Sequence, residues 1–380
     1  MTQDTITLAL DSFKGSIGAG PLGDAVGRGL RAEFPDKQVV NFPCSDGGDG
    51  FAQSVGHHFE ARRVECTVSD PLSRPRTAHY IWSPADRLAI VESAQANGLD
   101  LLNDAERDPL RTTTCGVGEL LLDAQRRGAG RIIIGVGGSA TVDGGIGMAQ
   151  ALGWRFNTPD GRHLGPQMAG FEPPATIVPP QPHPLDAVRI EVACDVRTRL
   201  LGPKEESAVW IYGPQKGGTE DSLALIEQHL TRLDASISEQ LGLEYGRLEA
   251  GGAAGGLAAG LAVFAGARLR NGMELFDEMA GLQAQIERSA LVITGEGRLD
   301  AQSAEGKVVS HVSAACRAAR VPVIALCGSV GEHTLPLDAV VALTDSALTA
   351  EQCIARPIDA LDAVFPRLVT AVKSSVISHQ

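Results

Sequence analysis

Residues 132 to 147, IIIGVGGSATVDGGIG, constrain the fold of this chain more than any other stretch. The apolar run Ile132–Ile134 predicts a short buried strand, and six glycines follow or interrupt it. Glycine weakens helices and strands, so a run this dense points to a required backbone geometry. Gly-rich turns let main-chain N–H groups approach an anion, so this stretch predicts a phosphate-type site, with a mobile turn as the simpler alternative.

Length and composition set the broad class. The chain has 380 residues, which predicts two or three domains, with 43% hydrophobic and 21% charged residues as in ordinary soluble proteins. A net charge of −13 and an aromatic content of 4% both argue against nucleic-acid binding. No apolar run approaches the roughly 20 residues of a membrane span, so we expect no membrane partner.

Lysine is used sparingly. Of 33 basic residues only six are lysine, and Lys14, Lys204, Lys216 and Lys307 lie in or beside Gly-containing loops. A compact point charge is what an anionic substrate needs in an otherwise acidic protein. Chance placement on surface loops is the alternative for any one of them.

The seven cysteines form no CxxC pair, and no Cys/His spacing suggests zinc. Several lie in apolar runs, as small buried side chains do. Together with the lack of a recognisable signal peptide, this predicts a cytoplasmic protein.

Both ends of the chain alternate strands with helices, which predicts an α/β fold with a parallel sheet. The predicted elements are strands at 6–10, 38–42, 291–294, 323–327 and 339–343, and helices through 22–30, 306–319 and 361–372. Four of these strands end in loops of Gly with Asp, Glu, Ser or Lys, where ligands bind in open α/β sheets.

The middle of the chain reads as a mixed α/β insertion. We place one domain at 1–69 with 287–380 and the inserted domain at 70–286, with crossings at 68–75 and 285–290. The middle elements expected are a helix at 112–125, a proline-rich irregular loop at 171–184, a strand at 190–193 and a Gly/Ala tract at 251–266. That tract is either a tightly packed helix or an anion-binding helix start.

Two nucleotide-binding motifs bear on the function of the chain. No GxxxxGK[ST] sequence occurs, which disfavours a P-loop enzyme. Gly135–Ala140 matches GxGxxA and makes a nicotinamide-dependent oxidoreductase the rival interpretation. Its context is poor, because three more glycines follow where a helix should start and Asp160 lies in a Pro/Gly turn.

Several acidic residues have two interpretations. Asp195 follows an apolar strand, where a partly desolvated carboxylate could hold a metal or accept a proton, or simply cap a turn. Glu296, Arg298 and Asp300 form either a functional loop or a structural ion-pair loop. Asp46 and Asp49 could equally be turn residues among glycines.

In combination the motifs resemble the bacterial glycerate kinase family, and the resemblance spans nearly the whole chain. The matching segments are DSFKGS (11–16), SDGGDG (45–50), RDPLRTTT (107–114), GVGGSATVDGGIGMAQALG (135–153), ACDV (193–196), GPQKGG (213–218), GGAAGGL (251–257) and TGEGRLD (294–300) with Gly306-Lys307.

The resemblance implies phosphorylation of D-glycerate that depends on ATP and Mg²⁺. It also implies a Rossmann-like domain made from both chain ends, a large inserted mixed α/β domain and an interdomain cleft that holds the site. The chain departs from the family at Asp49 and Phe51, at 204–206 (Lys-Glu-Glu) and in a longer 207–213 stretch. These departures affect substrate contacts rather than the reaction class.

Joining this resemblance to residue chemistry gives a hypothesis for the site. Asp195, Lys14 and Lys307 would be catalytic, with Asp195 taking the hydroxyl proton. Ser12 and Lys14 would bind the glycerate carboxylate at a helix N-terminus, and closure of the two domains would exclude water. The remaining assignments are Ser16, Asp46 and Arg298 for the substrate, Gly137, Gly138, Ser139, Ala140, Thr141 and Lys216 for ATP, and Asp46, Asp143, Asp195 and Asp300 for Mg²⁺.

Alternatives stay open at this point. A kinase for another small hydroxy acid is the nearest, followed by the oxidoreductase and by a non-catalytic sugar-acid sensor. The family resemblance favours the 2-hydroxyl over the 3-hydroxyl as acceptor. The sequence leaves the oligomeric state open, with a homodimer as the assembly considered.

Overall fold

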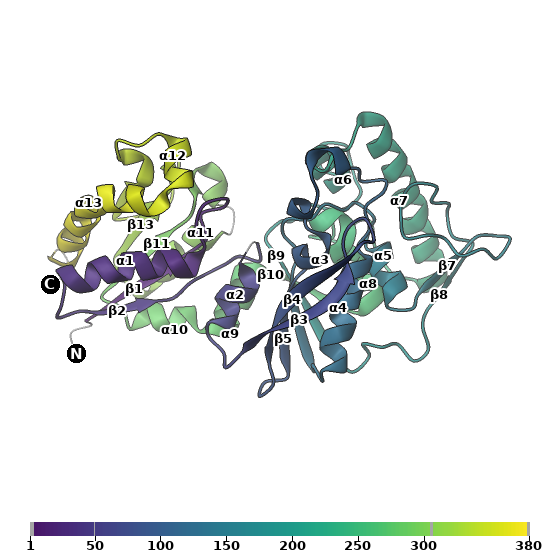
Figure 1. The fold of residues 1–380 in the computed structure, drawn as a ribbon, viewed down its shortest axis with the longest axis horizontal. Helices are drawn as coiled ribbons and strands as arrows, with labels where there is room; N and C mark the ends of the chain where they lie inside the picture. Colours follow the sequence, from purple (N-terminus) through teal and green to yellow (C-terminus); the bar gives the residue numbers. More distant parts are fainter. Residues whose placement is uncertain (1–3, 49, 305–306, 378–380) are drawn as a thin grey trace. The chain divides into compact units, whose positions relative to one another are not determined.

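The computed structural model describes residues 4–48, 50–304 and 307–377. These fold into two compact units (Figure 1), which we call unit 1 (residues 1–58 and 273–380) and unit 2 (residues 59–272). The expected class is confirmed, since both chain ends build one α/β unit with a parallel sheet and the middle builds a mixed α/β unit.

The sheet of unit 1 is parallel throughout, in the order β15-β13-β11-β1-β2. Its central strands pair in a register that sets Leu10 opposite Gly295, so the loops that follow both strands start side by side. The strands are β1 (Thr5–Leu10), β2 (Gln38–Asn41), β11 (Leu291–Gly295), β13 (Val323–Cys327) and β15 (Ala339–Ala342), with a small ladder of β12 (Arg298–Leu299) and β14 (Ser329–Val330).

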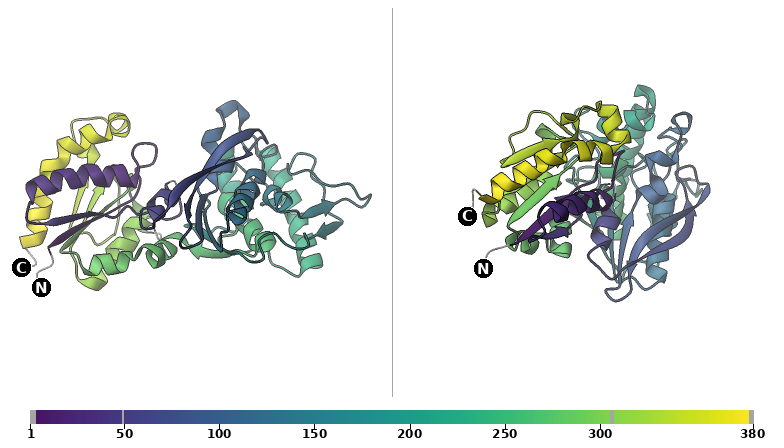
Figure 2. Two further views of the ribbon diagram at one scale, coloured as in Figure 1. Left: turned by 60° about the horizontal axis from the view of Figure 1, so that its bottom comes forward. Right: turned by 60° about the vertical axis from the view of Figure 1, so that its left-hand side comes forward.

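Helices cover both faces of this sheet. Leu8 and Leu22 share one buried cluster with Leu361, and Figure 2 shows α1 and α13 lying side by side on that face. Val309 of α11 packs with Ala325 on the other face. The helices are α1 (Ala19–Glu33), α2 (Phe51–Gly56), α9 (Gly272–Ala280), α10 (Leu282–Glu287), α11 (Val308–Ala319), α12 (Ala350–Ala355), α13 (Pro357–Ile377) and the short η5 (Ala301–Ala304) and η6 (Leu343–Asp345).

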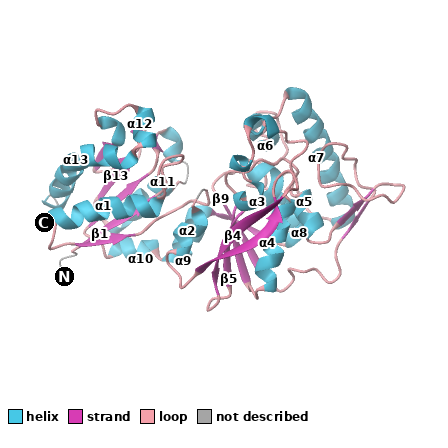
Figure 3. Ribbon diagram, viewed as in Figure 1, coloured by secondary structure: helices cyan, strands magenta, loops and turns pink. Residues whose placement is uncertain are grey.

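Unit 2 contains a sheet in the order β10-β9-β6-β5-β4-β3. The four strands from β10 to β5 are parallel, and β4 and β3 add an antiparallel hairpin. The strands are β3 (Arg62–Ser69), β4 (Pro75–Ser83), β5 (Leu88–Glu92), β6 (Arg131–Gly135), β9 (Arg189–Cys194) and β10 (Arg268–Asn271), with β7 (Arg155–Asn157) and β8 (Thr176–Val178) forming a separate ribbon (Figure 3).

The helices of unit 2 include α8, which occupies most of the Gly/Ala tract and confirms its helical interpretation. None of the helices in the described part of the chain is both long and apolar enough to span a bilayer. All seven cysteines are free. The helices are α3 (Ala94–Asn97), α4 (Cys115–Arg126), α5 (Ile146–Ala151), α6 (Ala208–Tyr212), α7 (Glu220–Leu241), α8 (Leu257–Ala265) and the short η1 (Leu99–Leu101), η2 (Asp104–Glu106), η3 (Pro214–Lys216) and η4 (Ala253–Gly256).

Some local predictions were wrong. Residues 68–75 are not a crossing but the turn of the β3–β4 hairpin, in which Ser69 pairs with Pro75. The loop expected at 171–184 contains β8, which pairs with β7. The domain limits after residues 69 and 286 stay a prediction, while the compact units divide after residues 58 and 272 because β3 pairs within the sheet of unit 2.

Candidate functional site

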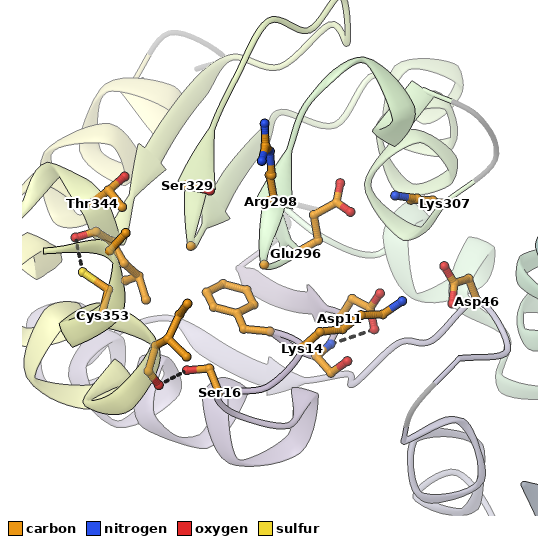
Figure 4. Close-up of a pocket in the computed structure, with 17 residues that line it drawn as sticks. Asp11, Lys14, Ser16, Asp46, Glu296, Arg298, Lys307, Ser329, Thr344 and Cys353 are labelled. Carbon is orange, nitrogen blue, oxygen red and sulfur yellow. Dashed lines mark hydrogen bonds between the residues drawn. The ribbon is translucent and has the colours of Figure 1, made fainter. Parts of the chain in front are cut away.

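A pocket of about 410 Å³ opens in unit 1, where all five strands of its parallel sheet end. Figure 4 shows it with Asp46 and Lys307 at one end and Thr344 and Cys353 at the other. Six residues predicted for substrate binding or catalysis line it: Ser12, Lys14, Ser16, Asp46, Arg298 and Lys307. The carboxyl edge of a parallel sheet therefore brings together side chains from distant parts of the sequence.

The loop after β1 is a closed turn of its own. The Phe13 N–H donates to the carbonyl of Ile17 at 2.8 Å, and the Ser16 and Ile17 N–H groups donate back to Phe13. Gly15 lies at φ +72°, which a side chain would strain. Helix α1 starts only at Ala19. The expectation that Ser12 and Lys14 sit at a helix N-terminus was therefore wrong.

Three carboxylates, those of Asp11, Asp46 and Glu296, approach one another in this pocket, and the sequence predicts a substrate or metal role only for Asp46. Burial, followed by the negative charge of Asp46, raises the pKa of Asp11 well above its usual value. Burial also raises the pKa of Glu296, an effect that the Ser303 hydroxyl and Lys307 partly offset. Asp11 and Glu296 each directly follow a buried strand, and that position is the signal that could have identified them.

Basic groups face these carboxylates. Lys307 is the N-cap residue of α11, so its ammonium lies beside a helix N-terminus that itself favours anions. Arg298 is 73% exposed and pairs with Asp300, with 3.0 Å between Nε and Oδ2. The ion-pair interpretation of this loop is thus confirmed for Arg298 and Asp300.

The Gly-rich loop after β6 lies in unit 2, and little of it is exposed. Gly138 is exposed and Gly137 partly so, whereas Ser139, Ala140 and Thr141 are buried. The carbonyl of Gly138 accepts from the Leu99 N–H at 2.8 Å, and the carbonyl of Ala140 accepts from the Thr112 hydroxyl at 3.1 Å. In a trans peptide the N–H group points away from the carbonyl of the same peptide unit. The two hydrogen bonds to the Gly138 and Ala140 carbonyls therefore fix the directions of the N–H groups that follow them.

Asp143 is fully buried and holds this loop together. Its Oδ2 accepts from the backbone N–H and the hydroxyl of Thr114, both at 2.8 Å, and from the Gly147 N–H. Its Oδ1 accepts from the Gly145 N–H. Burial raises the pKa of Asp143, and these hydrogen bonds counter the effect. Such contacts favour a structural role, and its role as a Mg²⁺ ligand stays a prediction.

Lys216 in η3 reaches the same loop from inside. Its Nζ donates to the Ser139 hydroxyl at 2.9 Å and to the Thr141 carbonyl at 2.8 Å. Burial lowers its pKa to about 7, and the nearby Asp143 charge opposes that shift. Lys216 therefore anchors the loop in this structure, and its predicted contact with ATP stays untested.

Asp195 follows β9, the strand beside β6, so it and the Gly-rich loop leave the same edge of the sheet. The side chain is exposed rather than partly desolvated as expected. The reason is local: the apolar run ends at Cys194, and the next residue already lies beyond the sheet.

The dinucleotide interpretation of Gly135–Ala140 lacks its structural context. That fingerprint needs a strand, a tight turn and a helix in immediate succession. Here β6 is followed by a long irregular loop, and α5 starts only at Ile146. We therefore set aside the nicotinamide-dependent enzyme.

Two of the expected positions, Asp49 and Gly306, lie outside the described residues. Among the residues that are described, no three His, Cys, Asp or Glu side chains converge in a preformed metal site. The four carboxylates predicted for Mg²⁺ divide between the units, with Asp46 and Asp300 in unit 1 and Asp143 and Asp195 in unit 2.

Known proteins resemble this chain along its whole length. The profile of the glycerate kinase family matches residues 6–373. The chain is 36% identical to the glycerate kinase of Bacillus subtilis over 374 residues, or 97% of each protein. It is 37% identical to the glycerate 2-kinase of Escherichia coli over 354 residues, 91% of this chain and 92% of that one. The crystal structure of a candidate glycerate kinase 2 from Salmonella typhimurium LT2 superposes with a TM-score of 0.85 at 38% identity, covering 99% of this chain and 98% of that chain.

Proposed function

Because the chain belongs to the glycerate kinase family, we propose that it transfers the γ-phosphoryl group of ATP to D-glycerate and forms 2-phospho-D-glycerate. The observation that carries this proposal is the unit 1 pocket, in which lysines and carboxylates gather at the carboxyl edge of the sheet. Phosphoryl transfer needs positioning and charge neutralisation more than covalent chemistry from the protein.

The acceptor acid binds at the charged end of this pocket. Lys14 supplies the positive charge for the glycerate carboxylate, and Ser12 contributes a hydroxyl from the same loop. Arg298 stands at the rim with its exposed guanidinium. The 2-hydroxyl oxygen attacks the γ-phosphorus, the bond from that phosphorus to the bridging oxygen of ADP breaks, and a base receives the hydroxyl proton.

Lys307 neutralises the charge that spreads over the phosphoryl oxygens during transfer. Its position at the start of α11 adds the N–H groups of that helix to its own charge. We propose Asp195 as the base that takes the proton, since its exposed carboxylate directly after β9 can accept a proton from a hydroxyl group.

The residues present fit Mg²⁺. This ion is held in nucleotide enzymes by one or two carboxylates together with phosphates and waters, so a cage of protein ligands is not required. Asp46 is the carboxylate we assign first, with Asp300 next, because both lie with the acceptor residues in unit 1. The mutual repulsion of Asp11, Asp46 and Glu296 also favours a bound cation. When bound, the ion would supply charge neutralisation to the ATP phosphates.

The Gly-rich loop is proposed to contact ATP phosphates through the N–H groups at its exposed tip, Gly137 and Gly138. Ser139, Ala140 and Thr141 then serve as the buried support of that tip. Lys216 sets its shape from below through the bonds to Ser139 and Thr141.

The test is to incubate the protein with ATP, Mg²⁺ and D-glycerate and to follow the mixture by phosphorus NMR. A new phosphomonoester whose coupling matches 2-phosphoglycerate is the expected result. The coupling pattern of 3-phosphoglycerate would move the acceptor to the other hydroxyl. Intact ATP with a folded protein would contradict the proposal and direct the search to another small hydroxy acid.

A further inference from the structure

The unit 1 pocket has a second end that the acceptor acid does not use. Its charged end contains Asp46 and Lys307, whereas its other end approaches Thr344 and Cys353 (Figure 4). The lining side chains around Cys353 are mainly apolar: Leu343, whose carbonyl accepts from the Cys353 thiol, and Ala350 and Ile354, which share helix α12 with Cys353. We call this set the apolar wall.

D-glycerate has no use for such a wall. Every carbon of this three-carbon acid bears oxygen, so it gains nothing from apolar contact. A pocket of about 410 Å³ also falls in the range that holds drug-sized ligands with a mostly apolar lining and a few polar groups. The pocket is therefore built for a ligand with one apolar end and one anionic end.

The topology of the sheet points to the class of that ligand. From β1 the chain runs through α1 to β2 on one side, while β11, β13 and β15 extend on the other side. The loops after β1 and β11 thus flank the switch point of the strand order. Nucleotides bind at this crevice in doubly wound α/β folds.

The apolar wall is held in place before any ligand arrives. The Ser16 hydroxyl donates to the carbonyl of Ile354 at 2.7 Å and fastens the loop after β1 to α12. Cys353 donates through Sγ to the carbonyl of Leu343, and the Thr344 N–H donates to the carbonyl of Gly328 at 3.1 Å. Such preorganisation lowers the entropy cost of binding a planar group.

We propose that the apolar wall is the subsite for the adenine ring of the nucleotide, a proposal that rests on the ATP-dependent function above. The ring packs on Ile354, which is 53% exposed and offers the wall's largest uncovered side chain. The partly exposed hydroxyls of Ser329 and Thr344 face the polar edge of the ring. The phosphates extend toward Lys307, at the other end of the pocket.

The test compares two exposed isoleucines. Ile354→Asn alters the wall, and Ile358→Asn alters an isoleucine of α13 that does not line the pocket. Calorimetry measures the Kd of ADP without D-glycerate, and a coupled assay measures KM for ATP and for D-glycerate. We expect Ile354→Asn to raise the first two constants about tenfold, the loss for one apolar contact of this size, and to leave the third unchanged. Ile358→Asn should change none of them.

A second variant guards against a local folding defect. Ala350→Glu places a carboxylate in the first turn of α12, where it suits the helix, yet it intrudes on the wall. It should also weaken ADP binding while circular dichroism stays that of the wild type.

Other outcomes overturn the inference. A rise in KM for D-glycerate alone, or tighter use of a larger apolar hydroxy acid, would assign the wall to the acceptor. No change in any constant, or no ADP binding by the wild type, would also reject it. If the wild type binds ADP but phosphorylates no glycerate, the function fails, and the effect of Ile354→Asn on the Kd of ADP still decides the subsite.

Discussion

In unit 1 the polar side chains of the loops line a pocket, whereas in unit 2 those of the Gly-rich loop face the interior. Asp143 accepts hydrogen bonds from the N–H groups of Thr114 and Gly145. Lys216 donates to the Ser139 hydroxyl and the Thr141 carbonyl. Lys14 and Lys307 instead line open space beside three carboxylates. In unit 2 the run of glycines therefore indicates a specific backbone conformation. The basic side chains that can bind an anion, Lys14 and Lys307, lie instead on loops of unit 1.

The largest expected effect is on stability in unit 2. Asp143→Ala strands the N–H donors of Thr114, Gly145 and Gly147 in the interior. Each buried unsatisfied donor costs about 1–3 kcal/mol, so the free energy of unfolding should fall by at least about 3 kcal/mol. Urea unfolding measures it, with Asp46→Ala as the pocket counterpart that should lose far less. If both variants lost the same free energy of unfolding, the proposed difference between a structural carboxylate in unit 2 and a pocket carboxylate in unit 1 would be contradicted.

The next largest expected effect is a loss of kcat when a charged group of the unit 1 pocket is removed. Lys307→Met should lower kcat about 100- to 1000-fold, as removal of a charge-stabilising group does. Its folding should be unchanged, since Lys307 is not buried. Lys37→Met, which removes a lysine paired with Asp4 outside the pocket, is the matched control. A steady-state assay showing the same kcat for both variants would remove Lys307 from the mechanism.

Asp195→Asn asks whether unit 2 also contributes chemistry. Loss of a general base lowers turnover by roughly 100-fold or more, and the exposed position predicts an intact fold. Single-turnover kinetics would measure the chemical step directly. Near-normal rates would exclude Asp195 as the base and leave unit 2 with positioning alone.

Lys216→Met tests the buried lysine through pH. Burial lowers the pKa of Lys216 from the ordinary lysine value of 10.5 to about 7 in the folded protein, so the unfolded chain binds more protons between these pH values. Wild-type stability therefore gains from this group as pH rises through that window. The stability of the wild type minus that of the variant should climb by up to about 1.4 kcal/mol per pH unit. A flat difference from pH 7 to pH 10 would mean that Lys216 stays charged in the folded protein.

The smallest effect concerns the rim of the pocket. Arg298→Ala removes an exposed ion pair with Asp300, which contributes little to folding. The melting temperature should stay at the wild-type value, while KM for D-glycerate rises several-fold through the loss of one charge-assisted contact. Arg288→Ala, on a helix end away from the pocket, is the control. Unchanged KM in both would limit acceptor binding to the loop after β1.

The strands of unit 1 were predictable from the sequence because they are short runs rich in apolar residues, and three of them, β1, β11 and β13, are closed by Gly or a charged residue. Leu291–Gly295 and Val323–Cys327 are fully buried strands of this kind. The β3–β4 hairpin was not predicted, although the alternating exposure of Arg62–Ser69 is typical of a half-buried strand, because the prolines at 71 and 75 suggested a linker.

The candidate site was predictable in its residue types and less so in its roles. Lys14 and Lys307 were found because lysine is rare in this chain. The burial of Lys216 was not predictable, since its partners Ser139 and Thr141 lie far away in the sequence. Asp11 and Glu296 were not predicted as site residues because their position after a strand does not show that they lie together, and only the pairing of β1 with β11 joins them.

The pairing of β1 with both β2 and β11 also determines when the sheet of unit 1 can be completed during synthesis of the chain. A ribosome makes the first 58 residues early, yet the strand that completes their sheet, Leu291–Gly295, emerges only after all of unit 2. Until then one edge of β1 has no neighbour, and an open strand edge invites pairing with other chains. The open edge of β1 must therefore be protected from pairing with other chains until β11 has been synthesised.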